Sequence, residues 1–427
     1  MSELMPKYGE NLKITGAQYD KSLAVKCING TFVGQRKENV LSFKGIPYVG
    51  AQPVGNLRWK APVDITPDNN VYEACHFAKL SVQDKSLGDN QGEDCLYLNI
   101  WRTDDRSDAK KPVMVWIHGG AFVSGGTGIE LFDCTNLIKE NPDVIFVTIA
   151  YRLGVLGFLH LSHLADGKDY PDAQNLALLD QKMALKWVHE NIAAFGGDPD
   201  NITVMGFESG ALSITLLAAS EQAKGLFQKA FVFHGSPLAA YETPEVSRAL
   251  AKKLLQETST TTMAELLRLP TERLKEASQK LALNLSAPTR DGKLIPVDVY
   301  AAYLNGAAAS VEFLIGIPGN ERQVYKSAVG SQKYENAITK ELNYVLRYLD
   351  AMAPDAAKAV RDYLEKQTAA TSALEANANF VEQIYAMSTY QCAKKLADGG
   401  SKVRLLYWDV KPLIENLGSG TVDVLAA

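Results

Sequence analysis

Residues 202–219 read ITVMGFESGALSITLLAA, and this stretch decides the fold. Ile202–Met205 is a short apolar run, partly β-branched, of the kind that forms buried strands. Ser209–Ala219 is apolar nearly all round, as a helix buried on every side would be. Because only residues 206–208 separate the two, the chain must turn sharply from strand to helix. A strand that runs directly into a buried helix is one unit of a sheet covered by helices.

The same alternation extends over most of the chain. The other runs expected to be strands are Val113–Ile117, Val144–Ile149, Ala230–Phe233, Phe313–Ile317 and Val403–Trp408. Helical periodicity covers Asp180–Ala194 and most of 244–284 and 335–396, with breaks expected at Pro270 and around Thr368–Thr371. This pattern predicts an α/β fold with a mostly parallel central sheet and helices on both faces. Ligands of such sheets bind beyond the carboxyl ends of the strands, so the residues that follow each strand are the functional candidates.

The turn after Val113–Ile117 reads HGGAF over residues 118–122. Gly119 and Gly120 would let the backbone approach a ligand closely and direct N–H groups at it. An oxyanion hole needs such donors, fixed before negative charge develops on a substrate oxygen. The alternative is a tight turn that requires glycine only for its φ angle and has no role in binding. A glycine pair within HGGAF favours the oxyanion loop.

The turn at residues 206–210 has glycine two positions before and two positions after Glu208. This spacing is typical of a nucleophile elbow, in which the central residue is strained and its neighbours crowd the backbone. In this interpretation Glu208 is the central residue, and the N–H of Ser209 completes the oxyanion hole. The alternative is an ordinary strand-to-helix turn, with Ser209 as N-cap and Glu208 near the positive end of the helix.

Several motifs together resemble the type B carboxylesterases, the cholinesterase-like family. They are FKGIPY at 43–48, EDCLYLNI at 93–100, HGGAF at 118–122, YRLG at 151–154, Asp180-Gln181 and NIAAFGGDP at 191–199. The resemblance implies an α/β-hydrolase fold and an ancestor that cleaved carboxylic esters with a Ser-His-Glu triad. It also implies that residues 1–427 form a single domain that lacks the family's C-terminal segment.

The resemblance assigns a role to each candidate site residue. Gly119, Gly120 and Ser209 correspond to the family's oxyanion donors. Glu208 stands at the position of the nucleophilic serine. Glu321, in IGIPGNE at 315–321, corresponds to the triad acid, although the residue after it is arginine where the family has glycine.

The triad histidine should lie in a loop after the Val403–Trp408 strand, where Thr421 takes its place. The last histidine of the chain is His234, so no alignment can supply one there. Without a histidine base a serine is a poor nucleophile, and loss of one triad member costs about four to six orders of magnitude in rate. A carboxylic ester hydrolase that is catalytically impaired or inactive is therefore the first hypothesis.

Two other hypotheses remain open. In the first, Ser209 is the nucleophile of an active ester hydrolase with an unorthodox base, for which His234 is the nearest candidate by topology. In the second, the chain is a fragment and a partner chain supplies the missing segment. A further expectation is that Arg152 and Asp180 form a buried ion pair that supports the site.

Composition narrows the function classes. A net charge of −5 leaves no basic footprint for nucleic acid. Neither a signal peptide nor a membrane-spanning run is recognisable, and five cysteines fit a reducing cytoplasm. Cys75 and Cys95 match positions that are disulfide-linked in secreted relatives, but they are expected here to be free and buried. The expected partner is a small ester or a related ligand, with no cofactor and no metal, and a homo-oligomer is possible.

Overall fold

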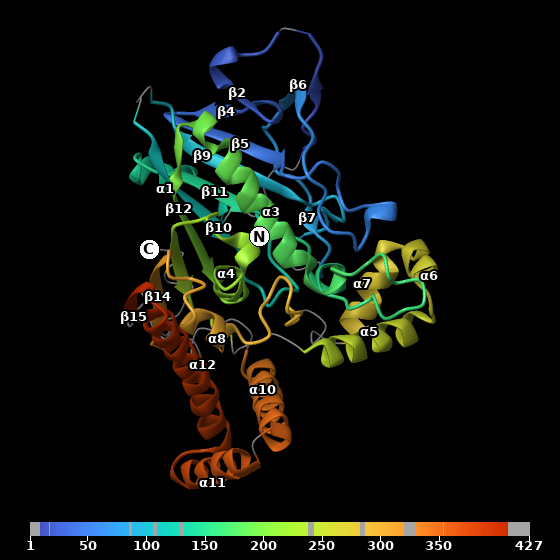
Figure 1. The fold of residues 1–427 in the computed structure, drawn as a ribbon, viewed down its shortest axis with the longest axis vertical. Helices are drawn as coiled ribbons and strands as arrows, with labels where there is room; N and C mark the ends of the chain where they lie inside the picture. The colour runs from blue at the N-terminus through green and yellow to red at the C-terminus, as the bar shows by residue number, and fades with distance from the viewer. Residues whose placement is uncertain are drawn as a thin grey trace.

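The structure is a computed structural model that describes residues 9–16, 18–84, 88–105, 109–128, 132–237, 243–281, 287–319, 326, 330–352 and 354–408. At its centre is a nine-stranded sheet with the order β15-β14-β13-β12-β10-β11-β9-β5-β4 (Figure 1). Its strands are β4 (Gln35–Lys37), β5 (Val40–Pro47), β9 (Tyr97–Thr103), β10 (Lys111–Ile117), β11 (Ile145–Ile149), β12 (Gly197–Phe207), β13 (Lys229–Phe233), β14 (Glu312–Pro318) and β15 (Lys402–Trp408). All pairings from β11 through β10 to β15 are parallel, and β9, β5 and β4 add an antiparallel edge. The predicted mostly parallel sheet is confirmed.

Every strand predicted from an apolar run is present within a few residues of its expected bounds. The antiparallel strands β9 and β5 were not predicted as strands. Both belong to segments recognised by family motif, and their backbone conformation was left open. Two smaller sheets accompany the central one. They comprise β1 (Lys13–Ile14), β2 (Ala24–Cys27), β3 (Asn29–Val33) and β6 (Asp68–Glu73) in the first, and β7 (Leu80–Ser81) and β8 (Gln91–Gly92) in the second.

Side chains of β10 alternate between two hydrophobic clusters, one on each face of the sheet. Val113, Val115 and Ile117 pack in the larger cluster, which includes side chains of the helices α3 (Leu176–Asn191), α4 (Ser209–Ala218), α8 (Val299–Leu304) and α12 (Ala373–Asp398). Trp116 packs in the other cluster with Ile138 of α1 (Thr135–Glu140). Because successive side chains of a strand point to opposite faces, both faces of β10 are buried, and helices cover the sheet on both sides.

The helices agree with the predicted periodicity and add two breaks. They are α1 (Thr135–Glu140), α2 (Gly154–Gly157), α3 (Leu176–Asn191), α4 (Ser209–Ala218), α5 (Pro244–Thr258), α6 (Met263–Arg268), α7 (Thr271–Lys280), α8 (Val299–Leu304), α10 (Ser331–Met352), α11 (Pro354–Ala370) and α12 (Ala373–Asp398). Pro270 separates α6 from α7, and α11 ends at the predicted break. The break at residues 259–262, between α5 and α6, and the break before Pro354 were missed. Proline is well tolerated at the first position of a helix, where its missing N–H costs nothing.

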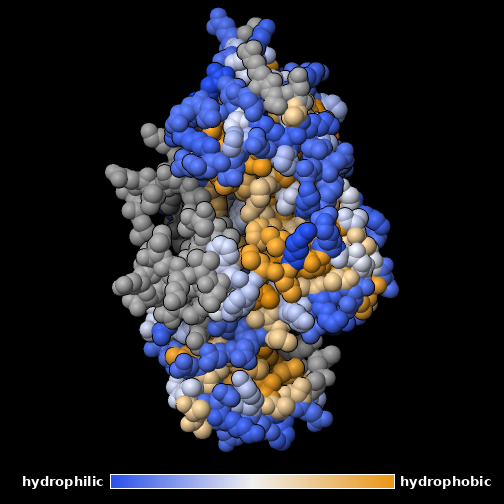
Figure 2. All heavy atoms as spheres, turned by 90° about the vertical axis from the view of Figure 1, so that its left-hand side faces the viewer, coloured by the Kyte–Doolittle hydropathy of each residue, from blue (hydrophilic) through white to orange (hydrophobic). Residues whose placement is uncertain are grey.

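The helices α10, α11 and α12 extend away from the sheet and have a hydrophobic cluster of their own (Figure 1). The chain then returns along α12 to β15, the edge strand. At this edge the side chains of Leu314, Leu405 and Tyr407 are 36%, 47% and 65% exposed. Figure 2 shows hydrophobic residues gathered over the middle of the molecular face that contains this edge.

In the part of the chain that the structure describes, no helix is both long and apolar enough to cross a membrane.

Candidate functional site

The sharp turn between β12 and α4 is built around Glu208, which has φ 54° and ψ −114°. A residue other than glycine is strained at such angles, which are typical of functional turns. The neighbouring glycines are required by space. A Cβ on Gly206 would lie 2.7 Å from the carbonyl carbon of Gly210, and one on Gly210 would lie 2.1 Å from the Ile117 carbonyl oxygen. The turn therefore presses α4 against the end of β10 and presents the Glu208 side chain beyond the carboxyl ends of the strands.

The HGGAF loop faces this turn and holds the Glu208 carboxylate. Glu208 Oε2 accepts hydrogen bonds from the backbone N–H groups of Gly120 and Ala121, both at 2.8 Å. Ala121 and Phe122 have φ of 52° and 60°, so the loop itself is in a conformation that side chains disfavour. The loop thus directs two N–H groups at one oxygen atom.

The Gly119 N–H, one of the predicted donors, gives neither of these two hydrogen bonds. Gly119 lies beside the carboxylate, because a Cβ added to it would be 3.1 Å from Glu208 Oε2. In the structure the converging pair is therefore Gly120 and Ala121, one residue later along the chain than the sequence predicted. The missing Cβ of Gly119 is what allows the carboxylate to approach.

Two fixed N–H donors that converge on one oxygen have the geometry of an oxyanion hole. Here the oxygen between them belongs to the protein. A substrate carbonyl oxygen would need the same position, and the carboxylate of Glu208 occupies it. The anion-binding capacity of the loop is satisfied from within the chain.

Ser209, the alternative nucleophile, is the first residue of α4. Its side chain is 3% exposed and lies beside the Tyr151 phenol. The residue that projects from the turn is Glu208, and the Ser209 hydroxyl is buried beneath it. As an alternative nucleophile, Ser209 stays a prediction from sequence.

The loop is braced from below by His118 and Tyr151. Their rings stack with centroids 4.2 Å apart, and the Tyr151 hydroxyl donates to the His118 carbonyl oxygen at 2.6 Å. The His118 Nδ1 is 2.9 Å from the Gly119 carbonyl oxygen. Burial lowers the pKa of His118 to about 4, so its ring is neutral at neutral pH. Neither residue was predicted from sequence to belong to the site, although both lie in family motifs, HGGAF and YRLG.

The predicted ion pair between Arg152 and Asp180 is confirmed. Arg152 Nη2 lies 2.6 Å from Asp180 Oδ1, and the two side chains are 3% and 0% exposed. The Arg152 backbone N–H and Nε both donate to Asp180 Oδ2, at 3.1 and 2.8 Å. This pair ties the segment after β11 to α3, and Tyr151 is the residue immediately before Arg152.

The residues proposed for proton transfer are only partly described. His234 follows β13, with φ 54°, and its N–H donates to the Gly316 carbonyl oxygen at 3.1 Å. Its ring packs edge-on against Tyr385 of α12, with centroids 5.6 Å apart. Glu321 and Thr421 lie outside the described residues.

A cavity of about 250 Å³ lies beside the HGGAF loop. Val123, two residues past Ala121, contributes to its wall. The rest is formed by Val82–Asp84 after β7, by Leu153–Leu156 at α2, and by Leu274, Lys275, Ser278 and Gln279 of α7. Among the residues described, no group of three or more His, Cys, Asp or Glu side chains could hold a metal ion.

Comparison with known proteins gives the family. The model of the carboxylesterase family matches residues 21–412. The chain belongs to the carboxylesterase family. This agrees with the α/β-hydrolase fold that the motifs predicted.

Similar proteins support the same family. The chain is 37% identical over 333 residues to the para-nitrobenzyl esterase of Bacillus subtilis (strain 168), a match that covers 74% of this chain and 66% of that protein. It is 34% identical over 360 residues to the bile salt-activated lipase of Mus musculus, covering 78% and 57%. The chain thus spans between about half and two thirds of the length of the curated relatives it matches.

Solved structures show the same fold. The Geobacillus stearothermophilus carboxylesterase Est55 at pH 6.2 superimposes with a TM-score of 0.80 at 32% identity, covering 93% of this chain and 82% of that one. A PNB esterase superimposes with a TM-score of 0.79 at 32% identity, covering 95% and 84%.

Proposed function

We propose that this carboxylesterase-family chain binds a small ester-like or carboxylate ligand without hydrolysing it. The observation that carries the proposal is the Glu208 carboxylate between the N–H groups of Gly120 and Ala121. Ester hydrolysis in this fold passes through an oxyanion that those donors must stabilise. With the donors engaged by Glu208, the transition state loses a stabilisation that is worth about 10²–10³ in rate for each donor.

Glu208 is also poorly suited to act as a nucleophile itself. Its Oε2 already accepts the two N–H groups that the new oxyanion would need. An attack by Glu208 would move its negative charge to the substrate oxygen, which would then need the two donors, while Oε2, now a neutral acyl carbonyl oxygen, still occupies them. The same contact that holds the side chain therefore opposes its attack.

The base is the second gap. In the 427 residues no histidine follows His234, whereas the triad mechanism needs one to take and return a proton. His118 is the first residue of the HGGAF loop, but its ring is buried, and the pKa of about 4 makes it a weak base. Each of the two gaps lowers the rate of ester hydrolysis, and neither removes the capacity to bind a ligand.

Hydrolysis of p-nitrophenyl acetate and butyrate tests the proposal. The purified chain should release p-nitrophenol no faster than the same chain with Glu208→Ala, and Glu208→Ser should also be silent because a serine alone has no base. Ser209→Ala is the matched control at the neighbouring position. Turnover by the wild type that Ser209→Ala abolishes would establish an active hydrolase with Ser209 as nucleophile. Turnover that depends on Glu208 would equally reject a binding-only function.

We further propose that the chain works in a reducing compartment such as the cytoplasm. All five cysteines are free thiols, Cys75 and Cys95 included. Burial raises the pKa of the Cys27, Cys95 and Cys392 thiols to about 12, which makes these three unreactive. Thiol titration of the unfolded chain, purified without reductant, should count all five. A loss of two thiols to a disulfide between Cys75 and Cys95 would contradict this compartment.

A further inference from the structure

The cavity beside the HGGAF loop has one unusual wall residue, Lys275 of α7. Lys275 is buried, with only 9% of the residue exposed. Its Nζ donates to Gln91 Oε1 at 3.2 Å, and among the described residues no carboxylate forms an ion pair with it. A lysine ammonium has three N–H donors, so this long hydrogen bond leaves most of its capacity unused. A buried ammonium without a counter-charge is costly, which makes the wall receptive to an anion.

Gln91 holds the surrounding loop in place around the ammonium. Its Oε1 accepts from the Gln83 N–H at 3.1 Å as well as from Lys275, and its Nε2 donates to the carbonyl oxygens of Asp84 and Gly88. All of its hydrogen-bonding capacity is used. Among the described residues of the cavity wall, Lys275 is the only cationic one, beside the neutral polar residues Gln83, Ser278 and Gln279.

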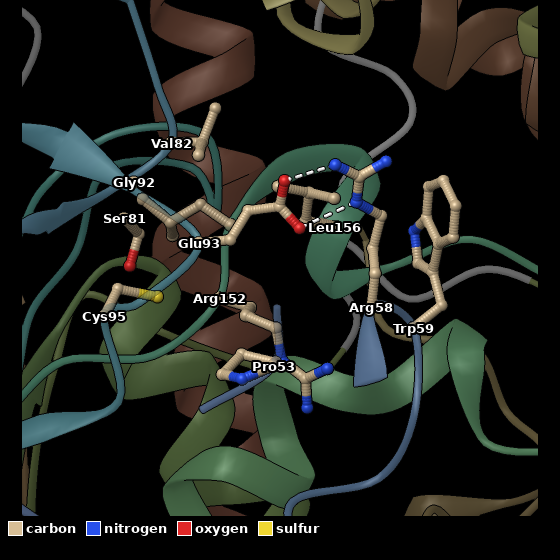
Figure 3. A pocket seen from close by; sticks show the side chains of 11 residues that line it. Pro53, Arg58, Trp59, Ser81, Val82, Gly92, Glu93, Cys95, Arg152 and Leu156 are labelled. Atoms are coloured by element: carbon tan, nitrogen blue, oxygen red, sulfur yellow. Dashed lines mark hydrogen bonds and ion pairs between the residues drawn. The ribbon is translucent and has the colours of Figure 1, made fainter. Parts of the chain in front are cut away.

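A second network fixes α7 itself. Arg58 forms a bidentate ion pair with Glu93, in which Nη2 lies 2.6 Å from Oε1 and Nε lies 2.7 Å from Oε2 (Figure 3). Arg58 Nη1 donates to the Leu269 carbonyl oxygen at 2.8 Å, and the Thr271 hydroxyl donates to Glu93. The start of α7 is thus anchored, and Lys275 follows one helical turn later. The small pocket in Figure 3 has only about 10 Å³ and holds no more than about one water.

The other walls of the cavity are largely apolar. Val82, Val123, Leu153, Val155, Leu156 and Leu274 provide this lining. A volume of about 250 Å³ lies just below the range of about 300–1,000 Å³ found for drug-sized ligands, so a smaller molecule is indicated. Asp84 is the only acidic wall residue among those described, and it is exposed, so water screens its charge.

We propose that this cavity binds a small organic carboxylate whose charge pairs with Lys275 and whose alkyl chain lies against the apolar wall. The inference rests on the proposed binding function and names its ligand class. It assigns to α7 a role in ligand selection that is separate from Glu208 and the HGGAF loop.

Calorimetric titration with hexanoate and its neutral isostere hexanamide tests the proposal. The wild-type chain should bind hexanoate at least tenfold more tightly than hexanamide. Lys275→Met keeps an unbranched side chain one heavy atom shorter and removes the charge, and it should abolish this preference. Lys280→Met is the matched control on the same helix, because Lys280 is 71% exposed and pairs with Glu257, and it should keep the preference.

Equal affinity for the two ligands in the wild type, or no hexanoate binding at all, would overturn the proposal without use of any variant. A preference that persists in Lys275→Met, with an unchanged urea midpoint that shows a folded chain, would also overturn it. Hexanoate is not an ester, so this outcome is independent of whether p-nitrophenyl butyrate is hydrolysed. Failure of the proposed function and failure of the Lys275 site are therefore seen in different experiments.

Discussion

Replacement of Glu208 by alanine or by glycine separates two opposing effects at the same position. Glu208 gains two charge-assisted hydrogen bonds at 2.8 Å, each worth about 1.5–3 kcal/mol. Ala121 is exposed and Gly120 is partly buried, so water would replace part of each bond. We expect Glu208→Ala to reduce the free energy of unfolding by about 1–3 kcal/mol. The backbone strain at φ 54° would remain, because alanine disfavours that angle as well.

Glu208→Gly loses the same hydrogen bonds but removes the strain, which costs about 1–3 kcal/mol in a residue other than glycine. The greater freedom of glycine in the unfolded chain offsets about 1 kcal/mol of that gain. The glycine variant should therefore be more stable than the alanine variant, by up to about 2 kcal/mol. Glu208→Gln, which keeps one oxygen acceptor but no charge, should lie between the wild type and alanine.

Urea unfolding measures the global effect, and amide hydrogen exchange at residues 120 and 121 measures the local one. Both amides should exchange at least about tenfold faster in Glu208→Ala, because the carboxylate that accepts from them is gone. If these amides exchange at the wild-type rate in the variant, the carboxylate does not hold the loop and the reasoning fails. It fails equally if the alanine variant is as stable as the wild type.

Three further outcomes follow from the surroundings of the site. The unfolded chain protonates His118 near pH 6.5 and the folded chain only near pH 4, so its contribution to stability is complete above pH 6.5 and is lost as the pH falls toward 4. The difference of 2.5 pKa units corresponds to about 3 kcal/mol. The free energy of unfolding of the wild type, measured with urea, should therefore fall more steeply from pH 6.5 to pH 4 than that of His118→Phe. Equal slopes in the two proteins would contradict the pKa assigned to His118. Asp180→Asn should reduce the free energy of unfolding by about 3–5 kcal/mol, because it leaves Arg152 buried and unpaired. The double variant Asp180→Asn with Arg152→Met should recover most of this loss. Additive losses would show that the two residues are not coupled. Gly210→Ala should cost about 3 kcal/mol or more, because its Cβ would clash with the backbone of β10. Gly225→Ala, where the Cβ meets nothing within 4 Å, should cost only about 1–2 kcal/mol through its positive φ, and equal losses would refute the steric account.

Most of the sheet could be predicted because its strands are buried on both faces. Such strands are continuous apolar runs, and the runs at Val113–Ile117 and Ile202–Met205 lie within β10 and β12. The antiparallel strand β9 was recognised only as a family motif, since a motif identifies residues without stating their backbone conformation. The break before Pro354 was missed because the periodicity on both sides of it is helical.

The site was only partly predictable. The glycines around Glu208 indicated a sharp turn. In the structure, a Cβ on Gly206 or on Gly210 would clash with neighbouring backbone atoms, which explains both glycines. Sequence spacing could not tell which N–H groups converge, and it favoured Gly119 and Gly120. The positive φ angles of Ala121 and Phe122 turn the loop so that Gly120 and Ala121 donate. The residue types alanine and phenylalanine do not predict positive φ angles.

By itself the sequence determined the family, the parallel sheet and the presence of a carboxylate where a serine is expected. These are local properties, because they depend on residue types at short spacing. Only the tertiary structure decided what that carboxylate does. Glu208 meets Gly120 and Ala121 from 88 and 87 residues away, and Lys275 meets Gln91 from 184 residues away. Contacts at such separations depend on how strands and helices pack, and local sequence patterns carry no information about the rotamer or the distance that results.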